Sequence, residues 1–385
     1  MLVKATLSAA LLAAAVLVGV GRAAEPPSFA LVGPSQADSV LSRVDPVTLR
    51  PSGRTLRLGN FSADRALSPD RTMLAIVSQD RPVVRFVDLR RMRATGVAVL
   101  STEGEVQSLR WTEEGLVALV DLPVGSKLVW LDPGTRKLTR TLRYRGELVD
   151  PRLVAGRLVV VEWPSRRVDS VRLDVVERDG RARSARIARI AGGWARRGNE
   201  ITRVAEPGLA VDPTGKLAWL ADGDGEICEV VLETFETRCN TVRGTAKSGA
   251  PWSRRQLRLV GEATLALSGW EKLTFGPKAA KSIGLWLVDT RTWSRRLLDP
   301  GIDSFRFSGG VVVGVRLGGV TAYGSDGSRR YAIEEPLQLG VISTTGPYLY
   351  VPRTDSSTVV AELSTGAVLR RSARGSTPIQ DLDTR

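Results

Sequence analysis

The sequence predicts an all-β chain, folded as a β-propeller of four-stranded antiparallel blades, and two recurring elements support this prediction. The first is a hairpin in which an alternating apolar strand, an acidic residue and a tight turn lead into a second strand rich in arginine. The second is a strand-turn-strand element that lies between successive hairpins. Successive units are spaced by roughly 35 to 56 residues, close to the length of a propeller blade. One hairpin plus two further strands gives one four-stranded blade.

The hairpin recurs about eight times, so we expect eight blades, with seven as the alternative because the fourth and seventh units are irregular. The units read SVLSRVDPVTLRPSGRTLRL, VVRFVDLRRMRATGVAVL, KLVWLDPGTRKLTRTLR, SVRLDVVERDGRARSARI, EICEVVLETFETRCNTV, IGLWLVDTRTWSRRLL, GVTAYGSDGSRRYAI and STVVAELSTGAVLRRS. No Pro- or Ser-rich linker interrupts them, which favours one propeller domain over residues 25–385 and disfavours two domains.

The strand-turn-strand element is clearest in ALSPDRTMLAIVSQD (66–80) and LAVDPTGKLAWLADGD (209–224). In each, proline stands at the first turn position, where its fixed φ suits a type I turn. The segments LSPDRTMLAIVSQDRPVVRFVDLRRM and VDPTGKLAWLAD resemble the blades of the bacterial YVTN, TolB and WD40-like propeller families. The Gly-His and Trp-Asp signatures of WD40 repeats are missing, and the chain has no histidine. The resemblance therefore implies a fold and carries over no functional residue.

A propeller has to close, because otherwise the end blades expose sheet edges. The first unit, from Ser28, has three recognisable strands, around FALVG, SVLSRV and TLRL. The C-terminal segment TPIQDLD (377–383) remains after the last hairpin, and we expect it to supply the inner strand of the first blade. The alternative is a disordered tail, since chain ends fray by default.

The N-terminal residues 1–24 read as a cleavable signal peptide. Lys4 precedes an apolar run to about Val20, and small residues follow, with cleavage near Ala23 or Ala24. We therefore expect a secreted or cell-envelope (periplasmic) protein without a transmembrane span after cleavage. The alternative is an uncleaved anchor.

The two cysteines lie in EICEVVLETFETRCNTV. A type I turn centred on Glu233 and Thr234 would place Cys228 opposite Cys239 on paired strands, within reach of a disulfide. Because an exported chain is oxidised, we expect a Cys228–Cys239 bridge, with two buried thiols as the alternative.

The absence of histidine removes the Ser-His-Asp and Cys-His triads and the imidazole ligands of most zinc, copper and haem sites. No catalytic motif is recognisable, so we assign no catalytic residue, expect no cofactor and lean against an enzyme. Asp222 and Asp224, in ADGDGE, are weak candidate ligands for Ca²⁺. The commoner interpretation of this pattern is an acidic turn between strands.

Four inter-strand segments differ from the other connections in length or composition, and each carries one tryptophan and several cations. They are EWPSRRVD (162–169), AGGWARRGNE (191–200), RGTAKSGAPWSRRQ (243–256) and GWEKLTFGPKAAKSIG (269–284). In a propeller these loops would emerge on one sector of one face. The predicted ligand-binding residues are Trp163, Arg166, Arg167, Trp194, Arg196, Arg197, Trp252, Arg254, Arg255, Trp270, Lys272, Lys278 and Lys281. Indole rings and arginine forks suit sugar rings and phosphates. The alternative role for each tryptophan is to cap the blade core. Trp130, Trp219 and Trp286 lie in alternating strands and are expected between blades.

The formal charge of +14 falls to +12 once residues 1–24, with Lys4 and Arg22, are removed. This excess favours an acidic partner, although a GC-rich genome also raises arginine content. We expect a monomeric, non-catalytic binding or scaffolding module of the cell envelope that recognises an anionic polymer or a partner protein. The alternative is a lactonase- or quinoprotein-type propeller enzyme with a metal or cofactor in its central channel. Nucleic-acid binding ranks last, because the chain is exported.

Overall fold

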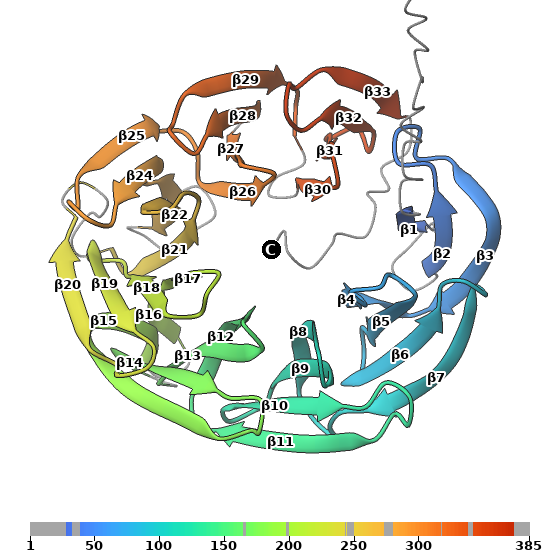
Figure 1. The fold of residues 1–385 in the computed structure, drawn as a ribbon, viewed down its shortest axis with the longest axis horizontal. Coiled ribbons are helices and arrows are strands. Elements are labelled where there is room, and N and C mark those ends of the chain that lie inside the picture. Colours follow the sequence, from blue (N-terminus) through green and yellow to red (C-terminus); the bar gives the residue numbers. More distant parts are fainter. Residues whose placement is uncertain are drawn as a thin grey trace, which may run out of the picture.

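The computed structural model describes residues 28–32, 39–164, 167–197, 200–242, 244, 250–272, 280–316, 318–337 and 342–372. The sheets stand around a central axis as a ring, with their first strands near the axis and their last strands at the rim (Figure 1). This confirms the predicted β-propeller of antiparallel blades. The predicted signal peptide (1–24) and the segment 377–383, predicted as the closing strand, lie outside the described residues. Within the described residues, no helix has the length and apolarity needed to cross a bilayer.

Among the described strands, six sheets are separate from one another. The first has three strands, as expected from the sequence: β1 (Ser28–Val32), β2 (Ser39–Val44) and β3 (Pro51–Gly59). The next two have four strands each: β4 (Phe61–Leu67), β5 (Met73–Ser78), β6 (Val83–Asp88) and β7 (Arg93–Val99), then β8 (Glu105–Thr112), β9 (Gly115–Asp121), β10 (Ser126–Leu131) and β11 (Leu138–Tyr144). The remaining three also have four: β17 (Gly208–Val211), β18 (Leu217–Ala221), β19 (Glu226–Val231) and β20 (Thr237–Thr241); β26 (Ser304–Ser308), β27 (Val311–Arg316), β28 (Gly319–Gly324) and β29 (Arg329–Glu334); β30 (Ser343–Thr345), β31 (Tyr348–Pro352), β32 (Thr358–Glu362) and β33 (Val368–Ser372).

The seventh sheet has ten strands. It contains β12 (Glu147–Val154), β13 (Arg157–Trp163), β14 (Val168–Val176), β15 (Ala182–Arg197), β16 (Glu200–Glu206), β21 (Trp252–Leu259), β22 (Thr264–Lys272), β23 (Ala280–Ser282), β24 (Leu285–Asp289) and β25 (Arg295–Asp299). Two antiparallel runs, β12 to β15 and β21 to β25, are joined through β16, which pairs in parallel with β21.

The expected count of eight separate blades is therefore wrong: six sheets are separate, and one continuous sheet takes the place of two of the expected units. The physical reason is β16, an additional strand between β15 and β17. Its residues 204–206 form ladder hydrogen bonds with the start of β21, so that two units share one hydrogen-bonded sheet.

The hairpin turns show why the acidic residue recurs in the repeat. Asp45 and Asp132 directly follow a strand and Asp289 is the last residue of one. The backbone N–H four residues later donates to the carbonyl of each, at 2.9, 2.7 and 2.8 Å. Each carboxylate also accepts the N–H of the threonine three residues later, at 2.6 to 2.7 Å, which holds its pKa below the usual value. The acid thus closes the turn from two directions.

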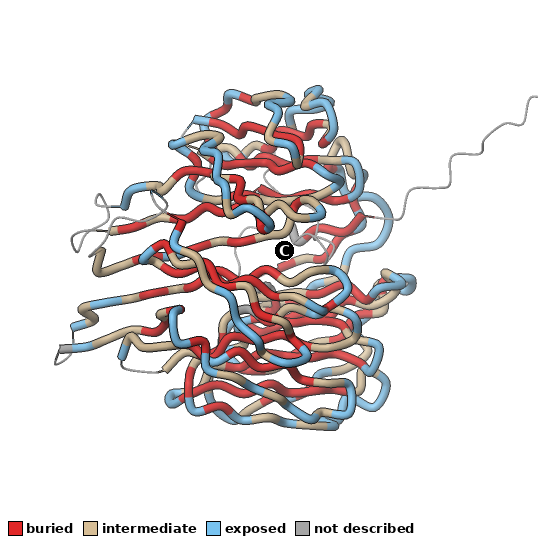
Figure 2. Tube along the Cα trace, turned by 60° about the vertical axis from the view of Figure 1, so that its left-hand side comes forward, coloured by how far each residue is buried: buried red, intermediate tan, exposed pale blue. Residues whose placement is uncertain are grey.

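Neighbouring sheets pack face to face, and alternate residues of one strand enter different cores. On β5, Leu74 and Ile76 pack toward β2, while Ala75 and Val77 pack toward the sheet of β8. Figure 2 shows buried positions along the stacked strands and exposed ones at the turns. The last and first sheets meet through Leu49 and Tyr350, and the Tyr350 hydroxyl donates to the Pro46 carbonyl at 3.0 Å. The ring thus closes by side-chain packing.

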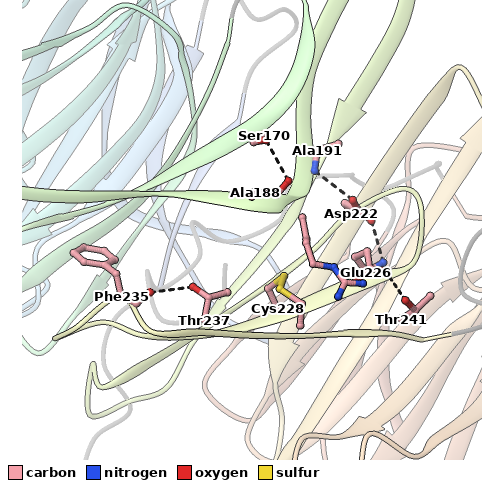
Figure 3. Close-up of a disulfide and its surroundings, with 11 residues drawn as sticks. Ser170, Ala188, Ala191, Asp222, Glu226, Cys228, Phe235, Thr237 and Thr241 are labelled. Carbon is pink, nitrogen blue, oxygen red and sulfur yellow. Dashed lines mark hydrogen bonds and ion pairs between the residues drawn. A yellow bond between two sulfur atoms is a disulfide. The ribbon is translucent and has the colours of Figure 1, made fainter.

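The predicted disulfide is present between Cys228 of β19 and Cys239 of β20, with Cα atoms 4.0 Å apart (Figure 3). The predicted register is confirmed, since Cys228 pairs directly with Cys239. The turn differs from the predicted type I turn: the Phe235 N–H donates to the Val231 carbonyl at 2.7 Å, and Phe235 has a positive φ of 58°.

We predict that reducing this bridge lowers the free energy of unfolding by about 3 kcal/mol, because it restrains a short loop in the unfolded chain. Chemical denaturation of the oxidised protein, of the same protein in dithiothreitol and of the C228A/C239A variant measures the effect. Equal stability of the oxidised and reduced forms would contradict the prediction.

Candidate functional site

The four segments predicted as loops contain strand ends among their described residues. β15 continues to Arg197, β16 begins at Glu200, β21 begins at Trp252 and β22 continues to Lys272. Together with β23 these strand ends form a five-stranded extension, named here the tryptophan extension (β15 from Gly193, β16, β21 to Arg255, β22 from Gly269, and β23). Positive φ angles of 111° and 151° at Gly193 and Gly269 accompany close backbone contacts that a side chain would block.

Strand register places three of the four tryptophans on one face of the extension. Trp194 pairs with Val204, Val204 with Trp252, and Trp252 with Lys272. Trp270 pairs with Arg254, two residues along from this row. Because paired residues and residues two apart share a face, these side chains form one surface.

Cations lie over the indole rings of this surface. The Lys272 ammonium is 5.5 Å from the centre of the Trp252 ring and 5.4 Å from that of Trp270, so it stands between the two. The Arg196 guanidinium lies 4.8 Å from the centre of the Trp194 ring. All three tryptophans are half-buried. The rings are therefore held by cation–π contacts and still offer surface to a ligand.

Glu147, at the start of β12, connects Trp163 to this surface. Its carboxylate accepts the indole N–H of Trp163 at 3.2 Å and that of Trp194 at 2.5 Å. Trp163 also packs on the core between β13 and β18, which agrees with a capping role for this one ring. Glu147 was not predicted as a site residue, because a single acid at a strand start carries no recognisable motif.

Acidic neighbours accompany two arginines of the extension, Arg254 of β21 and Arg203 of β16. Arg254 is exposed and pairs with Glu206 of β16 at 3.1 Å. Burial raises the pKa of Glu206, and the positive charge of Arg254 opposes that rise. Arg203 lies 3.7 Å from Asp224. These acids orient Arg254 and Arg203. None of the ion pairs described here neutralises Arg196 or Lys272.

The predicted ligand-binding role of Arg255 is wrong. Arg255 is 4% exposed and forms a buried ion pair with Glu271. Its guanidinium also donates to the Gly223 carbonyl at 2.9 Å. The reason is strand alternation: Trp252 and Arg254 face one side of β21, so Arg255 faces the other. Lys281 pairs with Glu271 and therefore also belongs to that opposite face, although it is exposed.

Of the other predicted cations, the structure describes the side chain of Arg167. Arg167 is exposed and lies 3.4 Å from Asp169. Arg166, Lys278 and the side chain of Arg197 lie outside the described residues. Of the tryptophans expected between blades, Trp130 and Trp219 are buried and Trp286 packs half-buried on the same core as Trp219.

Asp222 and Asp224 behave as turn residues. Asp222 is 2% exposed, and its carboxylate accepts backbone N–H groups from Ala191 at 3.2 Å and from Glu226 at 3.1 Å (Figure 3). It also accepts the N–H of Asp224 at 2.9 Å. Burial raises the pKa of Asp222 to about 6. Across the described part of the chain, no group of three potential metal-ligating side chains forms a metal site.

No family model and no curated protein matches this chain in sequence. Among solved structures, it is similar to the dihydro-heme d1 dehydrogenase NirN in complex with DHE, with a TM-score of 0.61, 13% identity, and 92% of this chain and 73% of that chain covered. It is also similar to Citrobacter koseri AztD, with a TM-score of 0.55, 13% identity, and 92% and 96% covered. BamB from Moraxella catarrhalis gives a TM-score of 0.51 and 13% identity over 80% and 84% of the two chains. At this identity the likeness supports the propeller fold alone.

We predict that Arg255→Met destabilises the protein by about 3–5 kcal/mol, because it leaves the Glu271 carboxylate buried without its cation. The double variant R255M/E271L removes both charges and is expected to recover much of that loss. Thermal unfolding followed by circular dichroism compares the two. A double variant less stable than R255M would contradict this account of the pair.

A second prediction concerns pH. The folded pKa of Asp222 lies above its ordinary value of 3.8, so the folded state binds the proton more tightly than the unfolded state. The contribution of Asp222 to stability is therefore fully present below about pH 4 and is lost as pH rises through about 6, by about 3 kcal/mol at most. The melting temperature of wild type relative to D222N should fall between pH 4 and pH 7. A constant difference would show that Asp222 is not the titrating group.

Proposed function

We propose that the protein is a non-catalytic binding module of the cell envelope and that the tryptophan extension binds an anionic, sugar-containing polymer. The observation that carries this proposal is the shared face of Trp194, Trp252 and Trp270, with Arg196 and Lys272 in contact with the rings.

The shape of this face favours a chain over a compact ligand. Strands in a sheet lie roughly 4.8 Å apart, so the five strands of the extension span roughly 20 Å. Rings recur along this span on β15, β21 and β22. Stacked sugar rings and flanking phosphate or carboxylate groups match an alternation of indole rings and cations. A partner protein with an acidic surface is the alternative occupant.

The placement of the protein in the envelope is part of the proposal. It follows from the signal-like residues 1–24 and from the net positive charge of the rest of the chain. Envelope polymers rich in phosphate or carboxylate present the complementary charge.

The test is co-sedimentation of the purified protein, without residues 1–24, with purified cell walls. We predict that W252A/W270A weakens binding at least tenfold, because the variant removes two stacking surfaces and the contacts of Lys272. Binding by wild type should also weaken steeply between about 50 and 500 mM salt, because salt screens the attraction between exposed charges.

The matched control is Trp293→Ala. Trp293 stands in the turn between β24 and β25, outside the extension, and is half-buried with Arg238 over its ring at 5.9 Å. The W293A variant should bind cell walls with an affinity within twofold of wild type. Equal loss in the control and in W252A/W270A, salt-insensitive binding, or no binding of walls by wild type would refute the proposal.

A further inference from the structure

A cavity of about 720 Å³ lies between the ends of the inner strands, and the proposed polymer-binding face does not include it. Its walls come from the ends of the inner strands or the turns that follow them: β4, β8, β12, β17, β21 and β26. The volume is typical of a pocket that encloses a small molecule.

Strand direction separates this cavity from the tryptophan extension. β21 begins at Trp252, in the extension, and ends at Leu259, in the cavity wall. The six residue steps from Trp252 to Arg258 span roughly 20 Å. The two sites thus lie at opposite ends of the same strand.

Four arginines contribute to the wall, namely Arg71, Arg110, Arg152 and Arg258, and the described lining residues include no carboxylate. Arg110 is 7% exposed, and its guanidinium donates to the Leu109 carbonyl at 2.7 Å. Each of the four also makes interactions within the chain beyond this one bond. A bound anion would therefore join or replace contacts that already orient the guanidinium groups.

Backbone irregularities place two of these arginines. Arg71 has a positive φ of 56° in the turn after β4. Arg152 follows Pro151, and the pairing of β12 with β13 shifts between Val149 and Arg152. Proline cannot donate to a ladder, and a bulge at such a point re-aims the next side chain.

The rest of the wall is largely apolar. It includes Trp111, Leu153 and Phe307, and the Trp111 indole N–H donates to the Ala66 carbonyl at 3.0 Å, which fixes the ring. Leu153 is 36% exposed although it is a large apolar side chain. A ligand that only neutralised charge would leave this apolar surface in water.

We propose that this cavity binds a small multivalent anion that carries its phosphate or carboxylate groups on an apolar body. The arginine forks bind the anionic groups in pairs of hydrogen bonds, and the apolar wall contacts the body. The proposal is independent of the function assigned to the tryptophan extension.

Isothermal titration calorimetry with two probes tests it: benzene-1,3,5-tricarboxylate, which has an apolar ring, and tripolyphosphate, which has none. We expect wild type to bind the tricarboxylate more tightly than tripolyphosphate. R152Q and R258Q, two half-buried positions where glutamine keeps a polar side chain, should each bind the tricarboxylate at least tenfold more weakly.

The control is Arg291→Gln, since Arg291 is 67% exposed and pairs only with an exposed acid, Glu262, at 3.1 Å among the described ion pairs. It should bind the probe as wild type does, and circular dichroism should show that all three variants keep the fold. Absence of tricarboxylate binding, tighter binding of tripolyphosphate, or equal affinity of R152Q, R258Q and R291Q would overturn the proposal.

Discussion

The ring depends on apolar packing between neighbouring sheets; among the described strands, only β16 and β21 join two of the expected units by a ladder of backbone hydrogen bonds. β5 shows this packing: it is buried on both faces because a neighbouring sheet covers each side. The same packing closes the ring: Tyr350 and Leu49, far apart in the chain, share a core, and the Tyr350 hydroxyl fixes their alignment through Pro46. Non-directional contacts suffice because the sheet twist already sets the angle between neighbours.

The exception is the parallel pairing of β16 with β21, and it accounts for the candidate binding face. The sheet of β17 to β20 packs on β13 to β15 on one side and on β21 to β24 on the other. β16 therefore runs along the edge of this sheet to reach β21. On the face of β21 opposite to Trp252, Arg255 forms its ion pair with Glu271 and donates to the Gly223 carbonyl. Directional hydrogen bonds here build a surface that packing alone would leave as separate loops.

Local patterns predicted local structure well. The spacing of Cys228 and Cys239 gave their pairing, and the three strands of the first unit were visible as alternating segments. The pairing of β16 with β21 was not visible, because it joins segments some fifty residues apart and leaves no periodic signal. Arg255 was assigned to the binding face for the same reason. A residue in a predicted loop has no strand alternation from which its face could be inferred. The cavity arginines were missed because they are scattered singly over several strand ends.

The net positive charge is a poor guide to these sites, because arginines on the outer strands also pack over aromatic rings at the rim of the propeller. Arg140 of β11 lies over Trp130, Arg183 over Phe235 and Arg295 of β25 over Trp286, so guanidinium groups on outer strands cover aromatic rings of the strand or turn beside them. Charged outer strands also resist edge-to-edge pairing between molecules. An arginine therefore points to a ligand only where register or strand direction gathers it with several half-buried tryptophans or with other arginines. That condition holds at the tryptophan extension and at the arginine-lined cavity.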